Sequence, residues 1–442
     1  MFRSLQRALL FMVGFSLPLQ GFSLLHYAFG LTPFKLATAL LLVAAAMHFA
    51  VVRSRMPRDP KRGLIIVFGV SYGLACVMGI VQGSSLTEIA ILASTQYSIL
   101  LYYLLLGYVV RTRDDLVLVL WALLLGGAVT AAPAALGMQQ GQEGLGYGER
   151  YGGLSGQANV LGFDMAVCIP VGAALYFAAR SILQRGLIAV LTGACLAGLL
   201  LSLSRAAFVA GAIMYSLWFY RSGRLDSIKY LIPGVVVLAG LLLLAPQSVE
   251  RRIETIVNPQ QRAQDASIQS RFEQFEFAVE AFASSPLVGI GVLRFVPWAR
   301  AQPGGALMYQ DIHNAYLWIA TDQGLLGLLP YVAILALTWR DYGRCLRSAR
   351  ARRRLRDPSL TEIGHYATFL QIALLGAMVG GAFSMQHLSK TMWLLLALSP
   401  VLAELGRKRV SELGAERLDR PSPASIRPLP TTPPAYSAPA TN

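Results

Sequence analysis

Charged side chains are scarce in this chain of 442 residues. Asp, Glu, Lys and Arg make up 14% of the sequence, 55% of the residues are apolar, and the mean hydropathy is +0.53. A soluble globular domain carries about 25% charged residues. The shortage of charge excludes an ordinary water-soluble protein and indicates segments that cross a membrane.

Cysteines and metal-binding motifs are also sparse. The four cysteines, Cys76, Cys168, Cys195 and Cys345, lie in expected spans or on the expected cytoplasmic side, which predicts neither a periplasmic disulfide nor a zinc site. The sequence contains no Asp-x-Asp pair, no His-Glu-x-x-His and no Walker loop. We therefore expect no metal site and no cofactor.

Long apolar runs dominate the chain instead, and each is long enough for a helix that crosses a bilayer. We therefore expect an all-α polytopic membrane protein with about twelve transmembrane helices. Hydropathy places these spans near residues 9–25, 34–52, 63–81, 89–110, 116–136, 159–179, 186–203, 206–220, 230–245, 315–338, 364–383 and 391–405.

The positive charges that give the net charge of +15 are unevenly distributed among the loops between these spans. The chain has 38 Lys and Arg against 23 Asp and Glu, and almost three quarters of the cations fall in alternate loops. Because Lys and Arg are enriched in cytoplasmic loops, this pattern predicts that both termini are cytoplasmic. The bias explains the basic charge without nucleic acid, so we expect contact with membrane lipids and no nucleic-acid partner. An additional site for a partner or an anionic lipid at Arg344–Arg356 stays open.

The expected spans define one transmembrane domain over residues 1–405. Residues 406–442 are rich in proline, which predicts a disordered cytoplasmic tail. Two loops on the outer face are long, near residues 137–158 and 246–314. Chemistry on that face is therefore expected to come from these two periplasmic loops and from helix ends.

The second long loop contains an apolar pattern with helical spacing. Phe272, Phe275, Val279 and Phe282 are separated by three, four and three residues, which predicts an amphipathic helix. Two interpretations stay open. The helix either lies at the membrane–water boundary or packs within an extracytoplasmic subdomain.

A few cations and histidines on the outer face are candidates for chemistry. Arg205 separates two apolar runs, where a guanidinium is costly unless it has a partner or snorkels to the interface. Together with Arg271 it suits forked contacts with a diphosphate. His313 directly precedes a span and is a candidate general base. His387, with Lys390 nearby, is a weaker candidate of the same kind.

Four motifs on this face occur in an order that resembles the O-antigen ligase and O-antigen polymerase superfamily, which also includes bacterial O-oligosaccharyltransferases. Asp322 departs from the pattern, because many relatives carry Glu there. The motifs are a Gly-rich stretch from Arg150 to Asn159, Ser204-Arg205, Ser270-Arg271 followed by Pro286-Leu-Val-Gly-Ile-Gly291, and His313-Asn314 followed by Gly324 and Gly327.

The resemblance implies a GT-C-like, metal-independent, inverting glycosyltransferase in the inner membrane of a Gram-negative bacterium, with a periplasmic active site. Its donor would be a glycan linked to undecaprenyl diphosphate. Arg205 and Arg271 would bind the diphosphate, and His313 would be the general base for the acceptor hydroxyl. Three further side chains would support them: Asn159, Asn314 and Tyr316.

Within this superfamily we expect an O-antigen ligase that moves O-antigen polysaccharide onto lipid A-core. An O-antigen polymerase is the main alternative, because it uses the same donor. A protein O-oligosaccharyltransferase is disfavoured by the short stretch after residue 405. A transporter or flippase is disfavoured because it would more often carry charged or broken-helix residues near the middle of several spans.

Overall fold

The computed structural model describes residues 2–21, 32–52, 58–135, 151–222, 266–306, 308, 310–351 and 357–418. The regular structure in these ranges is helical. Eight of the helices are long and apolar enough to cross a membrane. The chain is therefore an all-α polytopic membrane protein. These eight helices are α2 (Pro33–Val52), α3 (Arg62–Val81), α4 (Leu86–Val109), α5 (Arg113–Ala135), α6 (Ala158–Ala178), α7 (Ile182–Leu201), α14 (Ala315–Ala351) and α15 (Pro358–Gly381).

Three further helices coincide with expected spans: α1 (Phe2–Ser16), α8 (Arg205–Ser222) and α16 (Lys390–Leu418). Helices thus occur at every expected span except residues 230–245, which lie outside the described residues. The end of α1 differs from the expected end near residue 25. Pro18 lacks a backbone N–H, so the helix stops at Ser16.

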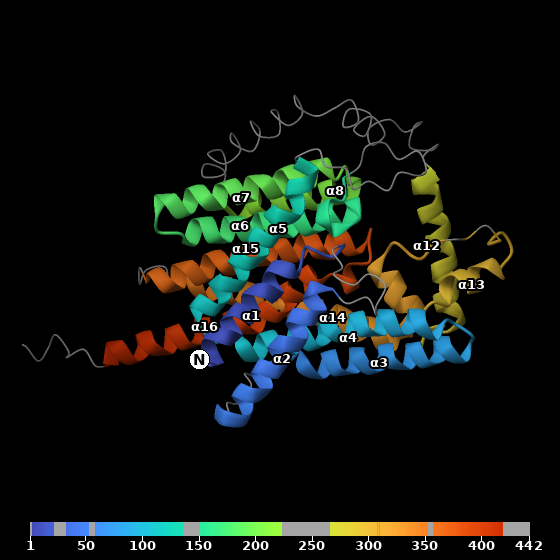
Figure 1. The fold of residues 1–442 in the computed structure, drawn as a ribbon, viewed down its shortest axis with the longest axis horizontal. Coiled ribbons are helices and arrows are strands. Elements are labelled where there is room, and N and C mark those ends of the chain that lie inside the picture. The colour runs from blue at the N-terminus through green and yellow to red at the C-terminus, as the bar shows by residue number, and fades with distance from the viewer. Residues whose placement is uncertain are drawn as a thin grey trace, which may run out of the picture.

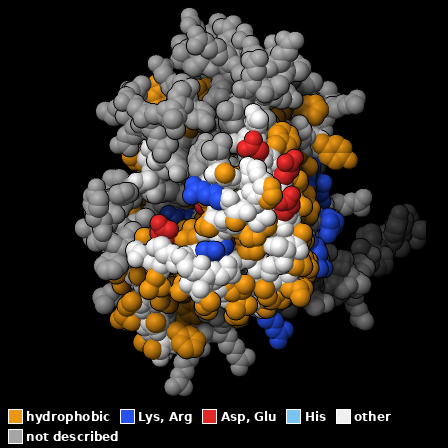
Figure 2. Space-filling model, turned by 90° about the vertical axis from the view of Figure 1, so that its right-hand side faces the viewer, with side chains coloured by type: hydrophobic (Ala, Val, Ile, Leu, Met, Phe, Trp, Pro, Cys, Tyr) orange, Lys and Arg blue, Asp and Glu red, His pale blue; other side chains and the backbone are white. Residues whose placement is uncertain are grey.

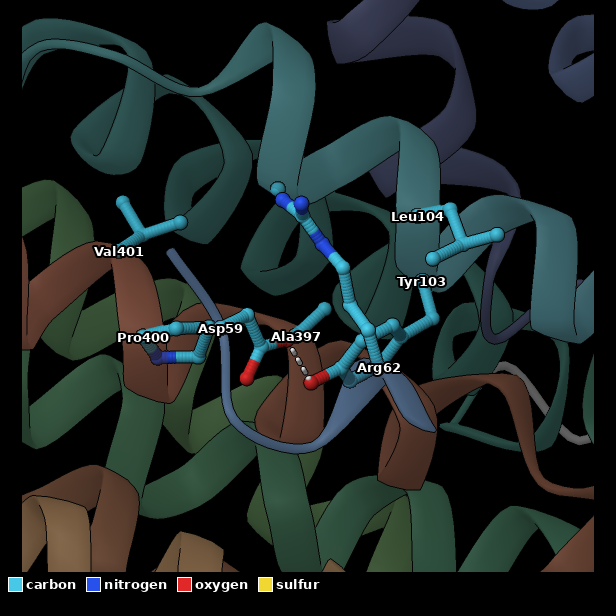
Figure 3. Close-up of a pocket in the computed structure, with 8 residues that line it drawn as sticks. Asp59, Arg62, Tyr103, Leu104, Ala397, Pro400 and Val401 are labelled. Carbon is cyan, nitrogen blue, oxygen red and sulfur yellow. Dashed lines mark hydrogen bonds between the residues drawn. The ribbon is translucent and has the colours of Figure 1, made fainter. Parts of the chain in front are cut away.

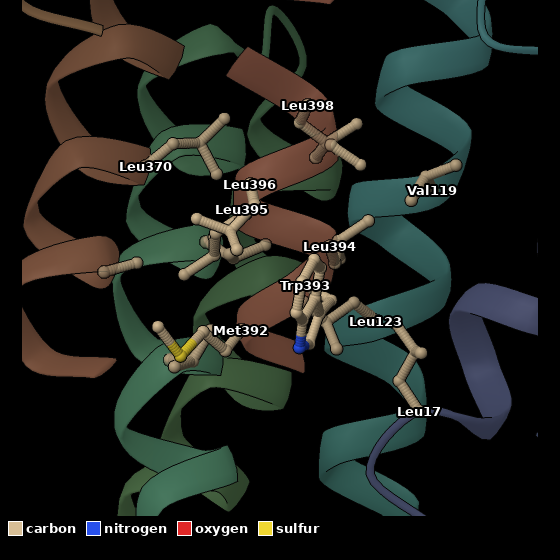
Figure 4. Close-up of a cluster of buried hydrophobic side chains, with 14 of the residues drawn as sticks. Leu17, Val119, Leu123, Leu370, Met392, Trp393, Leu394, Leu395, Leu396 and Leu398 are labelled. Carbon is tan, nitrogen blue, oxygen red and sulfur yellow. The ribbon is translucent and has the colours of Figure 1, made fainter. Parts of the chain in front are cut away.

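Most of the long helices lie side by side in one bundle, and α1, α2 and α5 cross it obliquely (Figure 1). α6 packs against α7 and α15, and α14 packs against α3, α15 and α16. The first turns of α16 lie in the centre of the bundle, where Trp393 is fully buried among leucines from neighbouring helices, including Leu123 (Figure 4). This apolar core holds the long helices together between the two ends of the bundle.

Ion pairs join distant segments at one end of the bundle, which we call the ion-pair end. The fully buried Lys61 ammonium lies 3.1 Å from Asp341 Oδ2, although the two residues belong to α14 and the start of α3. Arg113 contacts Glu362 at 2.7 Å. Each of these residues lies at or near a loop that the charge pattern assigned to the cytoplasm, so the structure gathers those loops at one end.

A small pocket also opens at the ion-pair end. Asp59, Arg62 and Tyr103 line it, and the Tyr103 hydroxyl donates a 2.6 Å hydrogen bond to Asp59 (Figure 3). Here α16 runs on as a helix to Leu418, past residue 405, where the last span was expected to end. Arg409 pairs with Asp357 at 2.7 Å, which ties this extension to the start of α15. The proline-rich residues 419–442 lie outside the described residues.

The opposite end of the bundle carries α12 (Ala266–Ser284) and the short helix α13 (Phe295–Arg300) (Figure 1). α12 packs against α14, with Ala278 and Ala281 fully buried. Its predicted apolar face points away from this contact, because Phe272 is 68% exposed and Phe275 51% exposed. Of the two interpretations left open, this exposure favours a position at the membrane–water boundary.

Candidate active site

His313 lies in the loop that enters α14, at the end of the bundle that carries α12; we call this the His313 end. Asn314 caps the helix, because its Oδ1 accepts hydrogen bonds from the backbone N–H groups of Tyr316 at 2.9 Å and Leu317 at 3.1 Å. This cap satisfies helix-terminal donors that would otherwise lack a partner. Asn314 therefore fixes the backbone next to His313.

The hydrogen bonds of His313 define which ring nitrogen carries the proton. Nδ1 lies 2.9 Å from the carbonyl oxygen of Asp311 and 3.1 Å from Oε1 of Gln274. The backbone N–H of His313 donates to the same Gln274 oxygen at 3.3 Å, so that side chain presents its acceptor to the loop. Two acceptors at Nδ1 require the proton there. The lone pair of Nε2 is then available to take a proton from a substrate.

Burial and a nearby cation keep this imidazole neutral. Burial lowers the pKa of His313 below its ordinary 6.5, the charge of Arg271 lowers it further, and the hydrogen bond to the Asp311 backbone opposes both. A lowered pKa keeps the base form present at neutral pH. Arg271 therefore lies within electrostatic range of the His313 ring.

Gln274 was not among the candidates, yet it connects these two residues. It is 2% exposed and lies one helical turn after Arg271 on α12. Gln274, Ala278 and Ala281 share one face of the helix and are buried against the rest of the protein. The only sequence signal for this position was a polar residue one helical turn before Ala278, on the helix face that also carries Ala281.

A backbone clamp holds α12 against α14, and it explains the glycines of the two C-terminal motifs. Gly324 has φ +62 inside α14, where it breaks the regular helix. The N–H of Leu325 donates to the carbonyl of Pro286 at 2.8 Å, and the N–H of Ile290 donates to Thr321 at 2.8 Å. A Cβ at Gly324 would lie 2.4 Å from the backbone of Leu287. Only glycine allows this close approach, so the clamp depends on it.

Arg205 is the first residue of α8 and follows a tight turn from α7. Leu203 in that turn has φ +49, a conformation that L-residues rarely adopt. Ser204 donates a 3.0 Å hydrogen bond to Oδ1 of Asn159 at the start of α6. The structure therefore brings Asn159 and Arg205 together through Ser204. Arg150, at the other end of that motif, lies outside the described residues.

Helix α15 contacts both the segment that carries His313 and the helices next to Arg205. The Tyr316 hydroxyl, two residues beyond Asn314, donates a 2.7 Å hydrogen bond to the carbonyl of Met378 near the end of α15. α8 also packs against α15. The same end of α15 lies close to the start of α6: a Cβ added at Gly380 would be only 2.7 Å from the Phe163 ring. The starts of α6, α8 and α14 thus meet at the His313 end. On this face, Lys and Arg side chains border a hollow (Figure 2).

His387 is a buried structural residue rather than a second reachable base. It is 1% exposed, its ring packs on Trp318 with centroids 5.5 Å apart, and burial lowers its pKa to about 3. Among the described residues, no group of three His, Cys, Asp or Glu side chains has a geometry that could hold a metal ion.

Residues 187–332 match the family model described as O-antigen ligase. The chain carries a domain of the O-antigen ligase superfamily. No curated protein matches the chain. The O-antigen ligase domain includes Arg205, Arg271, His313, Asn314 and Tyr316, whereas Asn159 precedes it. The match of this domain indicates a glycosyl-transfer type of activity related to O-antigen or lipopolysaccharide.

Proposed function

We propose that the chain is an O-antigen ligase of the Gram-negative inner membrane. It transfers O-antigen polysaccharide from undecaprenyl diphosphate to lipid A-core on the periplasmic face, and both of its termini are cytoplasmic. The observation that carries the proposal is the hydrogen-bonding of His313 within the O-antigen ligase domain, which leaves Nε2 unprotonated, while the charge of Arg271 acts on the same ring. The orientation is supported by the cationic loops gathered at the opposite end.

In the proposed reaction, Nε2 of His313 takes the proton from a hydroxyl of the acceptor sugar. The freed oxygen attacks the anomeric carbon of the donor, a new glycosidic bond forms, and the bond from that carbon to the diphosphate breaks. The departing diphosphate keeps the electron pair and is stabilised by the guanidinium groups of Arg205 and Arg271. Attack opposite the leaving group inverts the anomeric configuration, and this scheme uses no metal ion.

The remaining residues of the site hold these groups in place. Asn159 orients the turn before Arg205 through Ser204, while Asn314 and Tyr316 fix the start of α14 beside His313. Such positioning matters because two lipid-linked substrates must meet in one geometry, and proximity alone contributes a large part of the rate.

Deletion of the chain in its host distinguishes ligase from polymerase. A ligase defect leaves lipopolysaccharide without polymer while long O-antigen chains accumulate on the lipid carrier. A polymerase defect leaves single repeat units on the carrier and on lipid A-core. The proposal predicts the first pattern and its reversal by the wild-type gene. The second pattern, or unchanged lipopolysaccharide, contradicts it.

A further inference from the structure

Lys390 is a buried cation at the His313 end that the proposed reaction does not use. It is the first residue of α16 and only 5% exposed, and its ammonium lies 5.0 Å from the centroid of the Phe34 ring. It follows the η3 turn (Gln386–Leu388), whose His387 packs on Trp318 of α14. The ammonium is therefore close to the site without belonging to its catalytic groups.

The nearest acid does not neutralise this ammonium by direct contact. Asp164 on α6 attracts Lys390, but Oδ1 of that carboxylate accepts a hydrogen bond from Thr391 and Oδ2 accepts one from Gln20 at 2.9 Å. Within the described ranges, no ion pair or hydrogen bond to the Lys390 ammonium is formed. A buried charge without a direct partner is costly, which points to a ligand that supplies the missing acceptor.

A second lysine adds to the positive potential. Lys35 in the first turn of α2 is half-buried, donates to Ser94 at 2.8 Å, and repels Lys390 electrostatically. Ser389 and Thr32 cap the two helices, so both lysines lie at helix N-termini, where the backbone also favours an anion. Among the described residues, Asp164 supplies the carboxylate that attracts Lys390, against two cations and two helix termini.

This cationic cluster lies on a different flank from Arg205. α2 packs against α1 and α4, whereas α8 packs against α15 and α6. Figure 1 shows α8 and α2 on opposite sides of the bundle, with α16 between them. An anion held by Lys390 and Lys35 would therefore approach His313 from the side opposite the donor diphosphate.

We propose that Lys390 and Lys35 form an anion-binding subsite for a phosphate group of the acceptor glycolipid, a role that rests on the proposed function. The subsite holds the acceptor on the α2 and α16 flank while the arginines hold the donor on the α8 flank. Asp164 orients the start of α16 through Thr391 and limits the net charge of the empty subsite.

Equilibrium binding to the full-length protein in detergent tests this subsite without requiring turnover. The probes are phosphorylated lipid A-core, the same lipid A-core after chemical removal of its phosphates, and undecaprenyl diphosphate. Lys390→Met is expected to weaken binding of the phosphorylated probe at least about tenfold, because a charge-assisted hydrogen bond is lost. Binding of the other two probes is expected to stay unchanged, and Lys390→Arg is expected to restore most of the affinity.

Arg294→Met is the matched control. Arg294 lies at the same end and hydrogen-bonds Gln82 at 3.1 Å, so the variant removes one positive charge outside the subsite. If Lys390→Met does not fold, Lys35→Met supplies the same comparison, with a smaller loss expected because Lys35 is less buried. Equal weakening for both forms of lipid A-core, weakening for undecaprenyl diphosphate, or no weakening would overturn the subsite.

The binding assay separates this inference from the proposed function. If the phosphate-dependent loss occurs but the wild-type protein does not transfer glycan, the subsite stands and the ligase proposal fails. If the wild-type protein transfers glycan and the phosphate-dependent loss is absent, the subsite fails and the ligase proposal stands.

Discussion

Replacement of Gln274 tests how His313 is held as a base. In the wild-type protein, Oε1 of Gln274 lies 3.1 Å from Nδ1 of His313, and the carbonyl of Asp311 lies 2.9 Å from the same nitrogen. Gln274→Met keeps the length of the side chain and removes one of these two acceptors. A single hydrogen bond contributes about 0.5–1.5 kcal/mol, so kcat/KM for transfer is expected to fall about 2- to 12-fold.

Gln274→Glu gives a second, directional test through the pH profile. Transfer needs neutral His313, and its pKa is lowered below 6.5, so the wild-type rate should decline only as the pH drops below 6.5. A carboxylate beside Nδ1 stabilises the protonated ring and raises its pKa. The acidic limb of the profile should therefore move to higher pH in this variant.

The assay for both variants is the initial rate of glycan transfer by purified protein between pH 5 and pH 9. Gln302→Met is the control, because Gln302 bonds the Trp298 carbonyl at 3.4 Å on the same face of the molecule, in the α13 segment. An unchanged rate in Gln274→Met together with an unmoved acidic limb in Gln274→Glu would refute the assignment of His313 as a base held by Gln274.

Three other predictions follow from the site. His313→Ala should lower the transfer rate by about 10²–10⁴-fold, and Arg205→Ala or Arg271→Ala by about 10²–10³-fold, with normal amounts of protein in the membrane; lipopolysaccharide that still carries polymer in these strains would contradict the assigned roles. EDTA should leave transfer by purified protein intact, and a rate restored only by added divalent metal would rule out the metal-independent mechanism. Gly324→Ala should cost at least about 1–3 kcal/mol from backbone strain and lower the thermal unfolding midpoint, whereas Gly193→Ala, where an added Cβ meets nothing within 4 Å, should not.

The fold class was predictable because the length and hydropathy of a membrane-spanning helix can be read directly from consecutive residues. Runs of apolar residues located the helices, and the alternation of cations predicted which loops lie together. Helix ends were less predictable. α1 stops before Pro18 although the apolar run continues. α16 continues past residue 405, and an ion pair between Arg409 and Asp357 holds this extension. Such ends depend on a single residue or on a tertiary contact.

The candidate site was predictable only where a residue departed from the general pattern. Arg271 and His313 were found as a cation and a histidine on the face with few cations, and in the structure the charge of Arg271 acts on the His313 ring. Gln274 gave no comparable signal, because a glutamine in a helix has no distinctive spacing. The tautomer of His313 depends on its contact with Gln274, 39 residues earlier in the chain. The need for glycine at position 324 depends on the backbone of Leu287, which lies against it. Sequence patterns do not contain these tertiary contacts.

The central claim is that this protein moves a lipid-linked glycan onto lipid A-core with His313 as the base. The most direct measurement incubates purified protein with undecaprenyl-diphosphate-linked O-antigen and lipid A-core, and follows the mobility of the lipid A-core product. The account predicts that the wild-type protein forms polymer-bearing lipopolysaccharide and that His313→Ala, folded and membrane-inserted, does not. Transfer at the wild-type rate by His313→Ala, or a wild-type product in which glycan is joined only to other lipid-linked glycan, would contradict it.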